Sequence, residues 1–134
     1  MPEKRTIQRA RQDARQGKAP STQAGEFVRE EMEHIRKGKH GARSTKQAIA
    51  IGLSKARRAG VKLAPPKSGT TSTRTREQAE RDSAKGRSGR AKKPSAKRSR
   101  AALAALKKEG HSAASHAAIS KHARSAAARR ADSA

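Results

Sequence analysis

Apolar side chains recur in the first half of the chain at the spacing of an amphipathic helix. On a wheel of 3.6 residues per turn, one face of the stretch 23–37 carries Ala24, Phe27, Val28, Met32 and Ile35. Ser21 or Thr22 stands where an N-cap is expected. We therefore expect a helix over 23–37 whose apolar face is buried.

A second amphipathic stretch follows after a short basic connector that contains Gly38 and Gly41. Ser44 is placed to cap a helix that runs to about residue 59, and Gly60 is placed to end it. Its apolar stripe consists of Ala48, Ile49, Gly52, Leu53, Ala56 and Ala59. Two such helices with a short connector predict an antiparallel pair, whose open end Val61 and Leu63 can cover.

The flanking segments contain few large apolar residues. A short helix is expected over 3–16, ended by Gly17. No large apolar residue occurs between 64 and 102, so residues 64–98 are expected to form a disordered linker, interrupted at most by one short helix near residue 75. Ala-rich stretches on both sides of Gly110 predict two more helices, over 99–109 and 113–130. The side chains available for burial between these two helices are Leu103, Leu106 and Ile119.

This pattern predicts an all-α protein of loosely packed helical hairpins, with a disordered basic linker and no sheet. The expected segments are a basic N-terminal helix or arm (1–20), a basic amphipathic hairpin (21–63), the linker (64–98) and an Ala-rich C-terminal hairpin (99–134). Leu, Ile, Val and Phe together make up well under a fifth of the chain, too little for a sizeable core. Local helix formation and a partner must therefore complete the ordering of the chain.

Charge points to the class of that partner. The 134 residues include 34 Lys and Arg against 11 Asp and Glu, a net charge of +23, and the excess is spread along the whole chain. Such a chain needs a polyanion, and nucleic acid is the commonest one in a cell. No apolar stretch has the length of a signal-peptide core or a membrane span, so we expect an intracellular protein without a membrane partner.

Catalytic and metal chemistry find little support in the sequence. Cys is absent, which excludes disulfides, thiolate metal sites and a Cys nucleophile. The five histidines never stand at the i, i+4 spacing of a helical metal pair, and we expect them to be exposed; they are His34, His40, His111, His116 and His122. The glutamates between 26 and 33 are interpreted as charge partners for nearby Lys and Arg. We expect no enzyme activity, cofactor, metal or small-molecule substrate.

The mode of binding follows from the residue types. Phe27 is the one aromatic residue and lies on a core stripe, so base stacking is not expected. The connector before the helix at 44–59 is longer than a helix-turn-helix turn, which disfavours base readout in the major groove. Phosphate contact remains, and it is largely indifferent to sequence. The candidate contact residues are Lys39, Arg43, Lys46, Lys55, Arg57, Arg58, Lys62, Arg87, Arg90, Lys92, Lys93, Lys97, Arg98 and Arg100.

One stretch of the chain supports this interpretation by resemblance. Residues 38–60, which read GKHGARSTKQAIAIGLSKARRAG, together with 21–31, resemble a family of small basic bacterial proteins catalogued as a domain of unknown function and often labelled DNA-binding. The resemblance implies a bacterial cytoplasmic origin and carries no catalytic residues. With the charge of the chain, we expect it to lie in the bacterial nucleoid. We expect sequence-tolerant binding and compaction of double-stranded DNA. The alternatives are a ribosome or structured-RNA accessory protein and a hydrophilic stress-protection protein.

Overall fold

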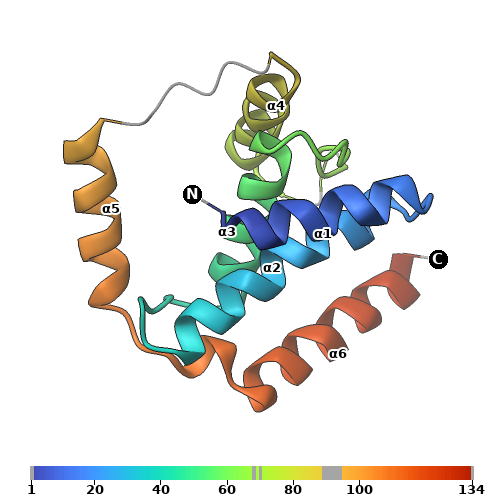
Figure 1. Cartoon of the computed structure of the whole chain (residues 1–134). Coiled ribbons are helices and arrows are strands. Elements are labelled where there is room, and N and C mark those ends of the chain that lie inside the picture. Colours follow the sequence, from blue (N-terminus) through green and yellow to red (C-terminus); the bar gives the residue numbers. More distant parts are fainter. Residues whose placement is uncertain (1, 68, 70, 89–94, 134) are drawn as a thin grey trace. The chain divides into compact units, whose positions relative to one another are not determined.

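The computed structural model describes residues 2–67, 69, 71–88 and 95–133 and confirms an all-α fold (Figure 1). These residues form six α-helices and one short 3-10 helix, and no sheet is found among them. The elements are α1 (Lys4–Arg15), α2 (Pro20–Arg36), α3 (Thr45–Arg58), α4 (Thr73–Ser88), α5 (Ala96–Lys107), η1 (Ser112–Ala114) and α6 (His116–Ser133).

The chain divides into two compact units, and each unit combines segments that are distant in the sequence. Unit 1 comprises Met1–Glu30 and Ile51–Lys93, and unit 2 comprises Glu31–Ala50 and Pro94–Ala134. The N-terminal part of α2 and the C-terminal part of α3 therefore belong to unit 1, and their other ends belong to unit 2. The hairpin segment expected at 21–63 contributes to both units.

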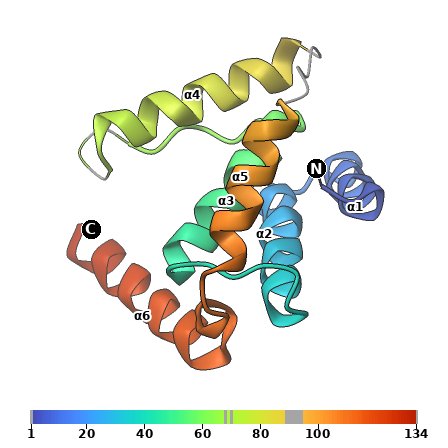
Figure 2. The same ribbon diagram turned by 90° about the vertical axis from the view of Figure 1, so that its left-hand side faces the viewer.

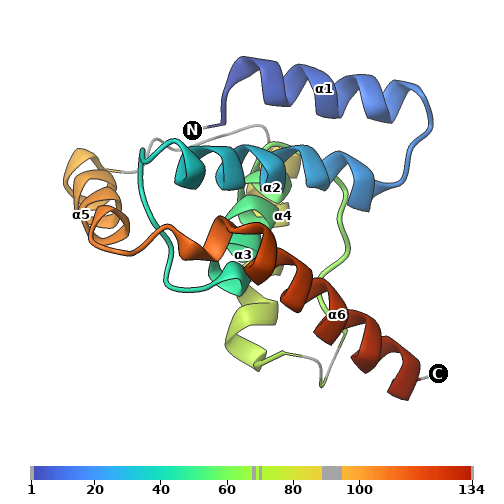
Figure 3. The same ribbon diagram turned by 90° about the horizontal axis from the view of Figure 1, so that it is seen from below.

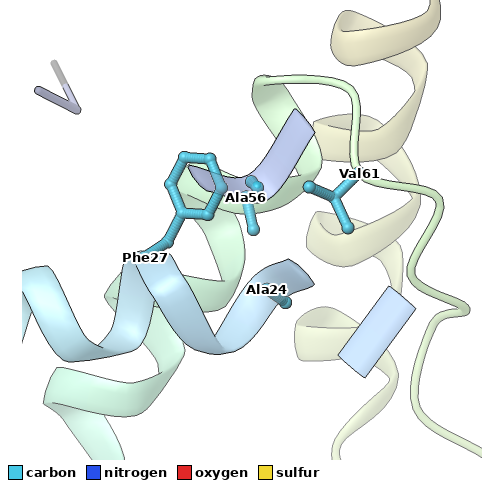
Figure 4. Packing of buried hydrophobic residues seen from close by; sticks show 5 residues of the cluster. Ala24, Phe27, Ala56 and Val61 are labelled. Atoms are coloured by element: carbon cyan, nitrogen blue, oxygen red, sulfur yellow. The ribbon is translucent and has the colours of Figure 1, made fainter. Parts of the chain in front are cut away.

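Unit 1 packs around Phe27, whose side chain is 1% exposed. Ala24, Ala56 and Val61 belong to the same cluster (Figure 4). Ala10 completes it, and Ile7, Leu53 and Leu63 are partly buried against it. Figure 3 shows α1 antiparallel to the N-terminal part of α2, which brings Ala10 into this cluster. Ala24 and Phe27 of α2 and Leu53 and Ala56 of α3 thus lie on the apolar faces expected for these helices, and Val61 and Leu63 pack against them, whereas Ala59 of the expected stripe is exposed.

The helices begin and end largely where local sequence signals place them. Gly17 and Gly60 take positive φ angles of 73° and 101° just after α1 and α3, a conformation that favours glycine. The Ser44 hydroxyl accepts the Gln47 amide at 3.1 Å, which confirms the predicted cap. The predicted start of α2 is wrong, because this helix begins at Pro20. Proline suits the first helical position, where its missing N–H has no partner to lose.

A glycine allows the two central helices to approach closely within unit 1. A Cβ added at Gly52 of α3 would lie 2.7 Å from the Cα of Val28 on α2. No larger residue fits this contact without moving the backbone of one helix. The stripe of small residues on α3 therefore serves close approach in addition to apolar burial.

Residues 73–88 form α4, so the expectation of a disordered linker there is wrong. Ser72 caps the helix by accepting the Thr75 amide at 3.2 Å. Asp82 anchors it to α3, and Gly86 comes so close to α3 that a Cβ there would overlap the Arg57 carbonyl. Hydrogen bonds and a close glycine contact pack α4 against α3, so a pattern of large apolar residues does not indicate this packing. Residues 89–94 of the expected linker lie outside the described part of the chain.

The C-terminal helices also differ in detail from the expectation. Ser95 caps α5 by accepting the Arg98 amide at 3.2 Å, so the helix begins at Ala96 and not near residue 99. Leu103 is 43% exposed, and the expected burial of this side chain is wrong. Burial falls instead on two small residues of η1, Ala113 and Ala114. The small side chains of these alanines leave their backbone carbonyls accessible to donors from Thr45 and Arg36.

Candidate functional site

The connector between α2 and α3 docks on the segment between α5 and α6 (Figure 2). The Gly41 amide donates to the Leu106 carbonyl at 2.8 Å, and the Ala42 amide donates to the Gly110 carbonyl at 3.0 Å. A Cβ at Gly41 would overlap the backbone of Glu109, so this position has room only for glycine. Two segments almost seventy positions apart thus form one backbone-paired structure.

Two side chains extend this docking into η1. The buried hydroxyl of Thr45 donates to the Ala113 carbonyl at 2.7 Å. The Arg36 Nε donates to the Ala114 carbonyl at 3.0 Å. Because a buried carbonyl without a donor is costly, these bonds favour one fixed position of η1 against the connector. The docking holds the basic connector next to the C-terminal end of α5, where Lys107 and Lys108 are exposed.

In unit 2 the positive side chains are exposed, and the described acidic side chains are buried or half-buried. It contains 14 Lys and Arg against 4 Asp and Glu, a net charge of +10. All 14 cationic residues lie in the described part of the chain and all are exposed. Among the acids, Glu31 is buried, and Glu33 and Glu109 are half-buried. The surface of unit 2 is therefore more strongly positive than its net charge alone implies.

Unit 1 has the larger net charge, +13, but more of its cations are engaged within the protein. Arg58 pairs with Asp82 at 2.9 Å, and Lys18 pairs with Asp13 at 3.3 Å. Arg57 is only 7% exposed, and its Nη2 donates to the Ala64 carbonyl at 2.9 Å. Burial lowers the pKa of Arg57, and the charge of Asp82 opposes that effect.

The 14 predicted contact residues fall into four groups. Those exposed in unit 2 are Lys39, Arg43, Lys46, Lys97, Arg98 and Arg100. Those exposed in unit 1 are Arg58, Lys62 and Arg87, and Lys55 is half-buried. Arg57 is buried, and its guanidinium bonds to the segment after α3. Arg90, Lys92 and Lys93 lie outside the described residues.

Asp82 is the electrostatic centre of unit 1. It is 2% exposed and accepts the Ser54 hydroxyl at 2.7 Å and the Arg58 Nε at 2.9 Å. Gln78 donates a third bond at 3.1 Å from within α4. Burial alone would raise the pKa of Asp82, but the three hydrogen bonds and the charge of Arg58 outweigh burial and lower it.

A second polar cluster lies inside unit 2, at the end of α2. His40 is 6% exposed, and its Nε2 lies 3.3 Å from Oε2 of Glu31, which is 0% exposed. The rings of His34 and His40 meet edge to face, with centroids 6.0 Å apart. One potential ligand atom from each of the three residues lies within 4.8 Å of the others. The expectation that the histidines are exposed and lack a carboxylate partner is wrong for His40.

The spacing Glu31-x-x-His34 could have indicated this cluster. Residues three apart share a helix face, so the carboxylate and the imidazole are placed together by α2 itself. His40 joins them only because the connector turns back after Gly38. The turn itself is local, because Gly38 takes a positive φ of 76° and the Gly38 and Lys39 amides donate to the Ile35 and His34 carbonyls at 3.1 and 3.0 Å.

A comparison with family models gives a match over part of the chain. Residues 4–68 match the model of a family of unknown function, DUF6496. The match includes the stretch 38–60 on which the resemblance rests and ends before α4. No curated protein and no solved structure matches the chain. No helix among the described residues combines the length and apolar character needed to cross a membrane.

Proposed function

We propose that this chain binds double-stranded DNA through phosphate contacts, without reading its sequence, and compacts DNA as a nucleoid-associated protein. The observation that carries the proposal is the charge separation in unit 2, where every Lys and Arg is exposed while the described acids are buried or half-buried. An exposed excess of cations attracts polyanions and releases counterions from them.

The same surface favours phosphate contact over base contact. Recognition of unpaired bases uses exposed aromatic side chains, and Phe27 is buried in the core of unit 1. Lys and Arg on α5 and on the connector can reach phosphates of any sequence. Binding of this kind depends steeply on salt and is nearly equal for unrelated duplexes.

A salt titration tests the proposal directly. Fluorescence anisotropy of two labelled duplexes of unrelated sequence is measured at several salt concentrations. If about six phosphates are neutralised, the logarithm of affinity falls against the logarithm of salt with a slope of about −5. Equal affinities and a steep slope support the proposal, and a flat salt response contradicts it.

Competition separates DNA from the RNA alternative. Unlabelled duplex DNA and duplex RNA of the same sequence compete for the protein against the labelled DNA. We expect DNA to compete at least as well as RNA. Stronger competition by the RNA duplex would favour the alternative of a structured-RNA accessory protein.

A further inference from the structure

We propose that Glu31, His34 and His40 form a binding site for a divalent transition-metal ion such as Zn²⁺. Two imidazoles and one carboxylate are a ligand set that zinc accepts, with a fourth position left for water or another group. Imidazole nitrogen favours Zn²⁺, Co²⁺ and Ni²⁺ over Mg²⁺ and Ca²⁺, which prefer oxygen ligands. The proposal does not depend on DNA binding.

The spacing of the ligand atoms suits tetrahedral coordination. Two ligands at about 2.0–2.1 Å from a tetrahedral ion lie about 3.3–3.4 Å from each other. His40 Nε2 and Glu31 Oε2 are 3.3 Å apart, which already matches one edge of such a tetrahedron. The third ligand atom, from His34, lies within 4.8 Å of both.

The second ring nitrogen of His40 is held as in many metal sites. Its Nδ1 lies 2.9 Å from the Gly41 carbonyl, an acceptor, so the Nδ1–H donates to this carbonyl. In the neutral ring the lone pair then resides on Nε2, the atom that faces Glu31. Metal-bound histidines characteristically make this bond, which fixes the tautomer and the ring orientation.

Burial adds an electrostatic reason for a cation at this place. Glu31 is fully buried, and a buried carboxylate is stabilised by a compensating positive charge. A divalent ion bound here would place positive charge directly beside this carboxylate. It would also tie the connector to α2 next to Gly41, whose amide pairs with Leu106. Metal binding should therefore stabilise the docked state of unit 2.

The experiment uses the full-length chain without a histidine tag, after removal of metal with a chelator. Co²⁺ is added first, because its visible absorption reports tetrahedral coordination, and Zn²⁺ is then titrated against a chromophoric chelator. We expect one ion per chain and an increase in the thermal midpoint with Zn²⁺.

Three variants each remove one ligand: Glu31→Gln, His34→Ala and His40→Ala. Removing a residue that hydrogen-bonds to a metal ligand typically lowers metal affinity by roughly 10–100-fold. Removing a ligand itself should lower the Zn²⁺ affinity by more than this. His116→Ala is the matched control, because His116 is exposed at the start of α6 and outside the cluster. Its affinity should equal that of the unchanged chain.

His34→Ala keeps the proposal testable if the other two variants fail to fold. His34 is half-buried, and its removal leaves the Glu31–His40 contact in place. Circular dichroism establishes whether this variant folds. Full Zn²⁺ affinity in folded His34→Ala, or failure of the unchanged chain to bind one ion, would overturn the proposal. In either case the contact between Glu31 and His40 would be a structural contact within unit 2.

Discussion

A single carboxylate, that of Asp82, connects α4 to α3. The bonds from Ser54 and Arg58 cross between the helices, and the side chain is almost fully buried. Hydrogen bonds to a charged group contribute about 1.5–3 kcal/mol each, so one residue can decide whether α4 is docked. This residue carries no apolar signal, which explains why the sequence pattern does not predict its role.

We predict that Asp82→Asn lowers the free energy of unfolding by about 1–3 kcal/mol at neutral pH. Asparagine retains the shape but loses the charge that Arg58 pairs with. Urea unfolding followed by circular dichroism measures the loss. Glu77→Gln is the control, since Glu77 makes an exposed pair with Arg81 at 3.7 Å and should contribute little. Equal effects of the two substitutions would contradict the role given to Asp82.

The same carboxylate predicts a dependence of stability on pH. Its folded pKa is lowered relative to an unfolded Asp, which titrates near pH 3.9. The folded state therefore binds this proton less readily than the unfolded state. The contribution of Asp82 is complete above about pH 4 and is lost as pH falls through the folded pKa. Unfolding at pH 7 and near pH 3 should show a smaller acid loss in Asp82→Asn than in the unchanged chain.

Arg57 and Lys62 carry the same charge but have different roles. Arg57 is buried and donates to the Ala64 carbonyl, whereas Lys62 is exposed. We predict that Arg57→Ala lowers the free energy of unfolding by about 1–3 kcal/mol, because it leaves a carbonyl without its donor. Lys62→Ala should leave stability within about 0.5 kcal/mol. Thermal unfolding measures the stability of both variants. If Arg57→Ala is as stable as the unchanged chain, the structural role given to Arg57 is contradicted.

At the level of elements, α5 offers the clearest test of phosphate contact. Lys97, Arg98 and Arg100 are exposed on this helix, and replacing all three with Gln preserves helix propensity. We predict that the triple variant flattens the salt slope by about three, because each phosphate contact contributes about one unit. Anisotropy titrations across salt concentrations provide the measurement.

The matched control neutralises three exposed cations of α1. Lys4, Arg5 and Arg15 are exposed in unit 1, and their replacement with Gln changes the net charge by the same amount. This variant should keep the original slope. If the salt slope becomes flatter by the same amount in both triple variants, net charge alone drives binding and α5 has no specific role in it.

The elements that could be predicted from the sequence are those built on apolar periodicity and glycine ends. For α1, α2 and α3, the buried faces around Ala10, Phe27 and Ala56 follow the 3.6-residue pattern. The remaining elements depend on contacts between distant positions. Asp82 meets Ser54 over 28 residues, and Thr45 meets Ala113 over 68. Neither pair leaves a local signal. The sequence therefore indicates a short helix near residue 75, but not the full length of α4, its docking on α3 or the docking of η1.

Across the whole molecule, the docking of the connector on the C-terminal segment depends on the absence of a side chain at Gly41. We predict that Gly41→Ala undocks the two segments, because the added methyl would overlap the Glu109 carbonyl. Hydrogen exchange should show lost protection of the Ala42 amide, while the amides around Phe27 in unit 1 stay protected.

Gly25→Ala provides the control for that substitution. Gly25 lies within α2, and nothing lies within 4 Å of an added Cβ there. Alanine in a helix is favoured over glycine by about 1 kcal/mol, so this variant should be slightly more stable and fully docked. Protection of Ala42 in Gly41→Ala equal to that in Gly25→Ala would contradict the docking described for unit 2.

The interleaved composition of the two units has a consequence for synthesis on the ribosome. Unit 1 has all its segments once residue 93 has emerged, but the partners of Arg36 and Thr45 are carbonyls at 114 and 113. Since chains grow by about 5–20 residues per second, the connector waits through a further interval of translation before it can dock. During that time the basic connector remains an undocked loop. The ribosome itself is a polyanion, and it is the first one this loop encounters.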